Sequence, residues 1–317
     1  MQLRTGRAAA MVAIAVSLLA VAVGGAGAAP SPPTPGTAAQ VASLVTASHR
    51  VSSLPKNLAP SVAASASDTP GAWYPQTAYG CVDLSVQTSK CVFGATSSSR
   101  TIVLFGDSHA QMWLPALAAE AKHLGDRLFL LFELGCPDTS VPVWDSVSRT
   151  YYTACDKFRA QALRAIPLLH PVAVLLADRT ALAMSSPTSY FSDVQWSKGL
   201  QTTLRALKVG TTKLVVLGDI PYINVDPPNC LATYPNGLQN CQGKNPNKPS
   251  HAHEAAEKAA AKALGATYVD PTKWLCTTIC SLVIGHFSVY SDHFHVTATY
   301  AEYLSGVLGA AVAKAIG

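Results

Sequence analysis

Charge is scarce in this sequence. Asp, Glu, Lys and Arg together make up 13% of its 317 residues, about half of the roughly 25% that is usual in globular proteins. The formal net charge is only +5, and no block of Lys or Arg lies beyond the N-terminus. Nucleic acid is therefore not an expected partner, because binding it requires a basic patch or stripe. A surface made mainly of Ser, Thr, Asn and small residues suits an exported protein instead.

Long apolar runs are also scarce: a single one, at residues 8–23, approaches the roughly 17 to 20 residues that span a bilayer. Arg4 and Arg7 precede it, and small residues up to Ala28 follow. This order predicts an export signal over residues 1–28, cleaved after Ala28, which leaves a formal charge of +5 − 2 = +3. An uncleaved N-terminal anchor is the alternative. In either case we expect a secreted or cell-envelope protein.

Free cysteines and metal-binding clusters are not expected. The eight cysteines all follow the export signal and fall into neighbouring couples. These couples are Cys81 with Cys91, Cys136 with Cys155, Cys230 with Cys241, and Cys276 with Cys280. An even number in an exported chain predicts disulfides, and pairing within each couple is a hypothesis that rests on each couple lying in a loop region. Because Cys and His residues do not cluster tightly, neither zinc nor another cofactor is expected.

The chain has enough apolar residues, 49%, for one sizeable core but not for two large domains. Residues 29–70 are rich in Pro, Ser, Ala and Thr and show weak periodicity, so they predict a tether that is partly ordered at best. The compact domain is expected over residues 71–317.

Beyond the tether, β-rich runs alternate with helical patterns. The expected strands, each short and apolar, are residues 101–105, 127–132, 172–177, 213–217 and 266–269. The expected helices are residues 109–124, 156–169, 193–207, 251–264 and 297–316. This alternation predicts a three-layer α/β/α fold with about five parallel strands covered by helices on both faces. Sites in such sheets gather beyond the carboxyl ends of the strands, and the long connection 220–250 is expected to form a wall of the substrate site.

A serine nucleophile is predicted where the first strand ends. Gly106, Asp107 and Ser108 follow this strand directly and precede a helix. At such a turn the hydroxyl of Ser108 can face solvent, while its N–H and the helix N-terminus point at an anion that forms beside it. The alternative is that Ser108 merely caps the helix.

An acid and a histidine precede the last helix. Asp292 lies three residues before His295, so it can fold back and hold one ring nitrogen while the other nitrogen accepts the proton of Ser108. The alternative makes Asp292 a turn residue and His295 a partly buried histidine. A metal site built from Asp292 and neighbouring histidines is not expected, because no ligand pair has helical i, i+4 spacing. Those histidines are His109, His286 and His293.

The two blocks, Gly106-Asp107-Ser108 and Asp292-x-x-His295, together resemble the first and last sequence blocks of the SGNH, or GDSL, hydrolase superfamily. The run from Phe105 to Ala110 is most similar to the SGNH domains attached to the C-terminus of membrane acyltransferase-3 proteins, which O-acylate cell-surface polysaccharides. The resemblance extends over roughly residues 70–316 through three further features, which are Cys136-Pro137, Cys155, and Trp274-Leu275-Cys276 with Cys280. An α/β-hydrolase matches less well, because Ala110 stands at the second glycine of Gly-x-Ser-x-Gly.

The resemblance implies a flavodoxin-like fold and acyl transfer through a serine ester, with an oxyanion hole formed by the N–H groups of Ser108 and Gly135. Gly135 is otherwise a plain turn glycine. The asparagine donor that many members carry after the third strand is missing, and Asp178 and Arg179 stand there instead. We expect these two residues to bind substrate or, alternatively, to form a structural charge pair.

These features predict an exported serine esterase or O-acyltransferase that acts on small acyl groups, acetyl above all, of envelope glycans. The expected partners are an acylated envelope polysaccharide as substrate and, for transfer, a separate membrane acyltransferase that hands over the acyl group. The alternative is a catalytically inactive SGNH module that binds glycans or serves as an envelope scaffold, which the missing asparagine permits.

Overall fold

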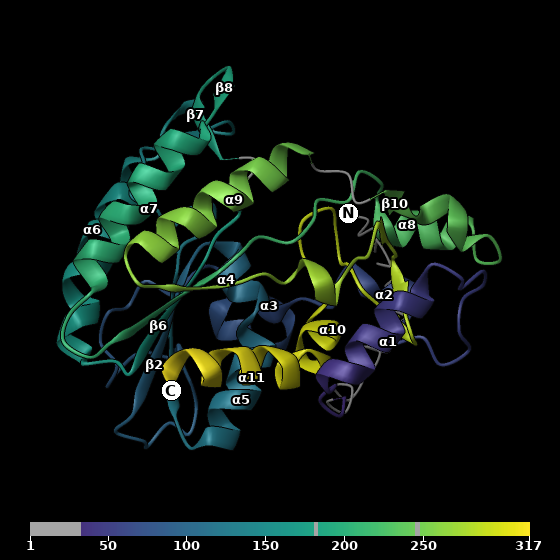
Figure 1. The fold of residues 1–317 in the computed structure, drawn as a ribbon, viewed down its shortest axis with the longest axis horizontal. Helices are drawn as coiled ribbons and strands as arrows, with labels where there is room; N and C mark the ends of the chain where they lie inside the picture. The colour runs from purple at the N-terminus through teal and green to yellow at the C-terminus, as the bar shows by residue number, and fades with distance from the viewer. Residues whose placement is uncertain (1–32, 181–182, 245–247) are drawn as a thin grey trace, which may run out of the picture. The chain divides into compact units, whose positions relative to one another are not determined.

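The computed structural model of the chain describes residues 33–180, 183–244 and 248–317 (Figure 1). The expected export signal, residues 1–28, lies outside the described residues. None of the described helices is long and apolar enough to cross a membrane.

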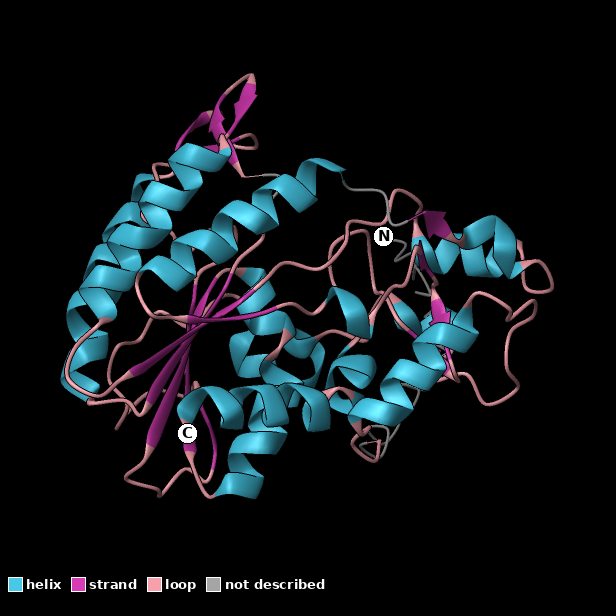
Figure 2. Ribbon diagram, in the orientation of Figure 1, coloured by secondary structure: helices cyan, strands magenta, loops and turns pink. Residues whose placement is uncertain are grey.

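A six-stranded sheet forms the centre of the domain (Figure 2). Its order is β1 (Val92–Gly94), β3 (Arg127–Phe132), β2 (Thr101–Gly106), β6 (Ala173–Ala177), β9 (Lys213–Leu217) and β11 (Thr267–Val269). The five expected strands are confirmed and run parallel, while β1 is an additional edge strand antiparallel to β3. In the sequence, the parallel strands appear as unbroken apolar runs because helices cover both faces of the sheet.

Helices form a layer on each face of the sheet (Figure 1). On one face lie α6 (Thr153–Ala165), α7 (Asp193–Leu207) and α9 (Lys248–Ala263); on the other lie α4 (Ser108–Met112), α5 (Leu114–Leu124), α10 (Ala298–Tyr303) and α11 (Ser305–Ile316). Alternate side chains of β2 serve the two faces: Val103 packs in the core with α6 and α7, whereas Leu104 packs in the core with α5 and α11. The α/β/α layering is thereby confirmed.

Two helices that the sequence predicts as continuous are each broken into two. Residues 109–124 divide into α4 and α5 at Trp113, and residues 297–316 divide into α10 and α11 at Leu304. In the first case Pro115 lies in the opening turn of α5, where its missing N–H removes a helical hydrogen bond. The first break leaves α4 as a single short turn that carries Ser108.

The N-terminal part of the expected tether packs against the domain. Helix α1 (Ala38–Ser48) begins with a capping box between Thr37 and Gln40, and it buries Val41 and Val45. These two valines lie one helical turn apart and therefore on one face of the helix, but the hydrophobic periodicity of the surrounding segment is too weak to predict them from the sequence. The sequence-based expectation of a largely unpacked tether is thus wrong for this helix.

Short elements complete the described chain. The remaining helices are α2 (Val62–Ser65), α3 (Pro70–Trp73), α8 (Pro227–Thr233) and the 3-10 turns η1 (Pro75–Thr77), η2 (Ile166–Leu169), η3 (Leu238–Cys241) and η4 (Thr272–Trp274). The hairpins pair β4 (Trp144–Asp145) with β5 (Thr150–Tyr151), β7 (Met184–Ser186) with β8 (Ser189–Tyr190), β10 (Gly243–Lys244) with β12 (Ile279–Cys280), and β13 (Val283–Ile284) with β14 (Phe287–Ser288).

Disulfides join each of the four neighbouring cysteine couples, and no cysteine is free. The Cys230–Cys241 bridge lies in the connection 220–250 and ties α8 to η3. The start of this connection contacts the loop of residues 289–297 before α10, here called the C-terminal loop, where Ile223 N–H donates to the carbonyl oxygen of His293.

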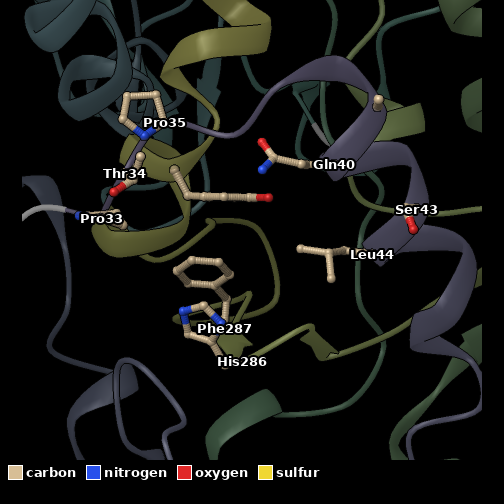
Figure 3. A pocket seen from close by; sticks show the side chains of 10 residues that line it. Pro33, Thr34, Pro35, Gln40, Ser43, Leu44, His286 and Phe287 are labelled. Atoms are coloured by element: carbon tan, nitrogen blue, oxygen red, sulfur yellow. The ribbon is translucent and has the colours of Figure 1, made fainter.

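A cavity of about 680 Å³ separates α1 from the β13–β14 hairpin and α10. Figure 3 shows Gln40 and Leu44 of α1 facing it from one side and Phe287 from the other. The loops that carry Ser108 and His295 do not line this cavity, so the cavity is separate from the predicted catalytic residues.

Candidate active site

Ser108 is the first residue of α4, directly beyond the carboxyl end of β2. The preceding Asp107 is the N-cap, and its Oδ1 accepts the N–H of His109 at 2.8 Å. The alternative that Ser108 serves as the cap is therefore wrong, and its hydroxyl is available for another partner. Gly106 permits this tight turn, because a Cβ there would collide with the carbonyl oxygen of Ala177 on the neighbouring strand.

A chain of hydrogen bonds links Ser108 to the C-terminal loop. Oγ of Ser108 lies 2.9 Å from Nε2 of His295, and Nδ1 of His295 lies 2.8 Å from Oδ2 of Asp292. With Nδ1 donating its hydrogen to the carboxylate, Nε2 is free to accept the hydrogen of the Ser108 hydroxyl. The structure thus brings the three residues together in the order that nucleophilic catalysis requires.

The loop fixes Asp292 by its own backbone. Oδ1 of Asp292 accepts the N–H groups of Phe294 and His295, each at 2.7 Å. Burial alone would raise the pKa of Asp292, but its hydrogen bond and charge interaction with His295, together with these backbone donors, outweigh burial and lower the pKa. Asp292 is therefore a carboxylate at neutral pH, as a residue that orients and stabilises an imidazolium must be.

Two backbone N–H groups without a hydrogen-bond partner in the described chain lie in the neighbouring turns that carry Ser108 and Gly135. Strands β2 and β3 are paired so that Gly106 lies opposite Phe132, which brings the turn at Ser108 next to the turn at Gly135. Among the described residues, neither the N–H of Ser108 nor that of Gly135 has a hydrogen-bond partner. Gly135 has a φ of +66°, so the turn itself also favours glycine there.

Asp178 and Arg179 turn in different directions and do not form a charge pair with each other. Asp178 is 5% exposed, and its carboxylate accepts the N–H groups of Asp138 and Thr139 at 2.8 and 3.2 Å. Burial, with the neighbouring Asp107 charge, raises its pKa to about 7. Asp178 therefore holds the loops after β6 and β3 together, and its carboxylate is buried.

Arg179 lies beside the C-terminal loop. Its guanidinium carbon is 4.0 Å from the ring centroid of Phe294, which separates Asp292 from His295. Its backbone N–H donates to Oδ2 of Asp107 at 3.0 Å, while its side-chain Nε is buried without a hydrogen-bond partner among the described residues. The side chain thus keeps an unused donor at the catalytic edge of the sheet.

A second histidine–aspartate pair packs against the first. Nδ1 of His109 lies 2.7 Å from Oδ1 of Asp219, and the His109 ring contacts the His295 ring edge-on at a centroid distance of 5.0 Å. Burial opposes a charge on His109, but the Asp219 carboxylate outweighs burial and raises the pKa of His109. Asp219 was not among the residues predicted from the sequence, although a Gly-Asp pair lies at the end of β9 as at the end of β2: Gly218-Asp219 and Gly106-Asp107.

An open cleft of about 590 Å³ adjoins these loops. Its lining combines the turns after β2, β3 and β6 with two hairpins, β4–β5 and β7–β8. The lining residues are Asp107, Leu134, Gly135, Pro137, Val143, Trp144, Asp145, Ser146, Val147, Tyr152, Arg179, Ala183, Met184 and Tyr190. The connection 220–250 was expected to form a wall of the substrate site, but none of its described residues lines this cleft; residues of the two hairpins line it instead.

The residues that the structure describes contain no group of three or more His, Cys, Asp or Glu arranged to hold a metal ion. His286 lines the α1 cavity, His293 stacks on Tyr222, and His109 bonds Asp219, so these histidines do not converge.

A family model described as the SGNH domain fused to AT3 domains matches residues 77–309. Among solved structures, the periplasmic domain of the lipopolysaccharide acetyltransferase of Salmonella ser. Paratyphi A is similar, with a TM-score of 0.62 and 16% identity over 80% of this chain and 98% of that one. A GDSL-like lipase from Bacteroides thetaiotaomicron gives a TM-score of 0.43 and 12% identity over 68% and 89% of the two chains. No curated protein matches.

Proposed function

Because the chain belongs to the family of SGNH domains fused to AT3 domains, we propose that it is an extracytoplasmic serine esterase or O-acyltransferase acting on acetyl groups of envelope glycans. One observation carries the proposal: the unbroken hydrogen-bonded series from Ser108 through His295 to Asp292. The disulfides support a location outside the cytoplasm, where such bonds persist. The lipopolysaccharide acetyltransferase domain that shares this fold supports a glycan as the substrate.

The first half-reaction forms an acyl-serine. Oγ of Ser108 attacks the carbonyl carbon of the ester while Nε2 of His295 takes its proton, and Asp292 stabilises the imidazolium that results. The N–H groups of Ser108 and Gly135 donate to the oxyanion of the tetrahedral intermediate. As the intermediate collapses, the bond to the sugar oxygen breaks and that oxygen receives the proton from His295.

The second half-reaction releases the acyl group. Water or a sugar hydroxyl attacks the acyl-serine and gives its proton to Nε2 of His295, which returns it to Oγ of Ser108 as the ester bond to the serine breaks. Hydrolysis and transfer differ only in which oxygen attacks. For transfer, a membrane acyltransferase is the proposed partner that loads the acyl group.

A non-catalytic glycan-binding module is the competing proposal. A separation of Ser108 and His295 too large for a hydrogen bond would favour it, whereas their separation of 2.9 Å favours catalysis.

Labelling with a serine-reactive fluorophosphonate tests the proposal. Intact mass should reveal one adduct on the protein, and the adduct should be lost in Ser108→Ala and His295→Ala. Ser61→Ala is the matched control, because Ser61 is exposed and its side chain makes no capping hydrogen bond. The absence of an adduct from the parent protein, or its persistence in Ser108→Ala, would refute the serine assignment. Hydrolysis of 4-nitrophenyl acetate by the same variants provides a second reading.

A further inference from the structure

We infer that the cleft between hairpins β4–β5 and β7–β8 binds the sugar of the ester, with Trp144 and Tyr190 against the ring and Arg179 bonding its oxygens. The inference rests on the proposed function and adds the place where the glycan lies.

The cleft begins next to the proposed reacting residues, although Ser108, Asp292 and His295 do not themselves line it. Gly135, whose N–H is the proposed second oxyanion donor, lines it, and so does Asp107, the residue before the nucleophile. An ester whose carbonyl oxygen lies between the N–H groups of Ser108 and Gly135 therefore has the opening of the cleft beside it. The larger of its two substituents has about 590 Å³ available there, within the roughly 300–1,000 Å³ usual for small-molecule sites.

The hairpins present aromatic rings that are held in place. The Tyr151 ring contacts Trp144 edge-on at a centroid distance of 5.2 Å, and the Tyr152 hydroxyl donates to Oε1 of Glu133 at 2.8 Å. Tyr190, on the facing hairpin, is 57% exposed. Rings that combine a flat apolar face with a polar edge, and that have only two side-chain torsions to fix, make favourable contact surfaces.

Polar groups with unused hydrogen-bonding capacity lie among these rings. Nε of Arg179 is buried without a partner in the described part of the chain. The Asp145 carboxylate accepts the N–H groups of Val147 and Ser148, which leaves further lone pairs, since a carboxylate has about four acceptor positions. Arg179 lines the cleft and is partly exposed, and its side chain makes no hydrogen bond to the described residues, so its guanidinium can donate to a ligand oxygen.

This mixture fits a sugar better than a fatty acyl chain. A long acyl chain requires a continuously apolar wall, whereas two carboxylates and a guanidinium line this cleft, namely Asp107, Asp145 and Arg179. A sugar ring can pack its C–H groups against aromatic faces, and its hydroxyls can form hydrogen bonds to charged side chains. Such bonds are stronger than hydrogen bonds between two neutral groups.

The test compares a sugar ester with a small ester that lacks a sugar. Glucose pentaacetate and 4-nitrophenyl acetate are the two substrates, and Trp144→Ala is the first variant. We expect the ratio of kcat/KM for the sugar ester to kcat/KM for the small ester to fall about tenfold, mainly through KM. Tyr190→Ala is the second variant, which keeps the test valid if Trp144→Ala folds poorly. Tyr234→Ala is the matched control and should leave the ratio unchanged, because Tyr234 is an exposed tyrosine directly after α8 that does not line the cleft.

Two failures are distinguishable. If the parent protein forms the fluorophosphonate adduct but the ratio is unchanged in both cleft variants, the sugar site is wrong and the proposed function stands. If no adduct forms on the parent protein, the proposed function itself fails, and the sugar site that rests on it fails with it.

Discussion

Replacing Asp292 by Asn tests the proposed proton path most directly. In the variant, Oδ1 of residue 292 can still accept the two backbone N–H groups that Asp292 accepts at 2.7 Å, so the loop should keep its shape. The new NH₂ group takes the place of Oδ2, which lies 2.8 Å from Nδ1 of His295. Because two donors cannot share that contact, His295 adopts the tautomer that carries hydrogen on Nε2, and it cannot accept the proton of Ser108.

The size of the effect follows from the two contributions that are lost. A hydrogen bond to a charged partner contributes about 1.5–3 kcal/mol. Restoring the productive tautomer against a repelling NH₂ costs about as much again. Together they amount to about 3–6 kcal/mol, a loss of about 10²- to 10⁴-fold in rate. A change from Asp to Asn in another serine hydrolase triad costs about 10⁴-fold for the same reason.

The assay is the second-order rate constant of fluorophosphonate labelling at neutral pH, measured by intact mass. Asp226→Asn is the matched control: Asp226 caps α8 through its contact with the N–H of Asn229, a task that Asn also performs, and its labelling rate should equal that of the parent. If Asp292→Asn labels at more than about a tenth of the parental rate with an unchanged melting temperature, the proposed role of Asp292 is refuted.

Two further predictions concern stability. Burial raises the pKa of Glu257 from 4.5 to about 8, so the folded state retains a proton that the unfolded state loses, and stability falls as pH rises from about 4.5 to about 8. Glu257→Gln, which can keep the bond from Trp196 Nε1, should therefore raise the melting temperature at pH 8 but not at pH 4.5; equal shifts at both pH values would contradict this. Gly106→Ala should lower the melting temperature by more than about 5 °C, because its Cβ collides with the Ala177 carbonyl, whereas Gly243→Ala, where a Cβ meets open space, should change it little.

Much of the fold can be predicted from the sequence because its parallel strands are buried on both faces. Such strands appear as unbroken apolar runs, as residues 101–105 and 213–217 do, and their ends agree with β2 and β9 to within a residue. Strand β1 has three residues and lies at the sheet edge, so it leaves no comparable run. Helix α1 is not predicted from the sequence, because two buried valines in a segment rich in small residues give little hydrophobic periodicity.

The candidate residues Ser108, Asp292 and His295 can be predicted because each lies at the boundary of a regular element. The contact between Asp219 and His109 could not be predicted from the sequence, because it depends on how the loops after β9 and β2 pack against each other. The cleft could not be predicted either. Its hairpins have strands of two or three residues with no alternating pattern, and tertiary packing alone brings them together.

The aspartates after the strands explain why the expected asparagine is missing. Asp107 accepts the N–H of Arg179, and Asp219 accepts the N–H of Thr180 at 3.0 Å. These contacts, with those that Asp178 makes to the β3 loop, tie the loops after β2, β3, β6 and β9 to one another.

Position 178 is thus occupied by a buried carboxylate whose two oxygens both accept hydrogen bonds from the loop after β3. An asparagine side chain that faced outward from this position would leave those N–H groups without partners. The next residue is the first after β6 that can reach the cleft, and it is Arg179. In the proposed site, a donor for substrate oxygens is therefore available one residue later than the family pattern places it, on a longer and charged side chain.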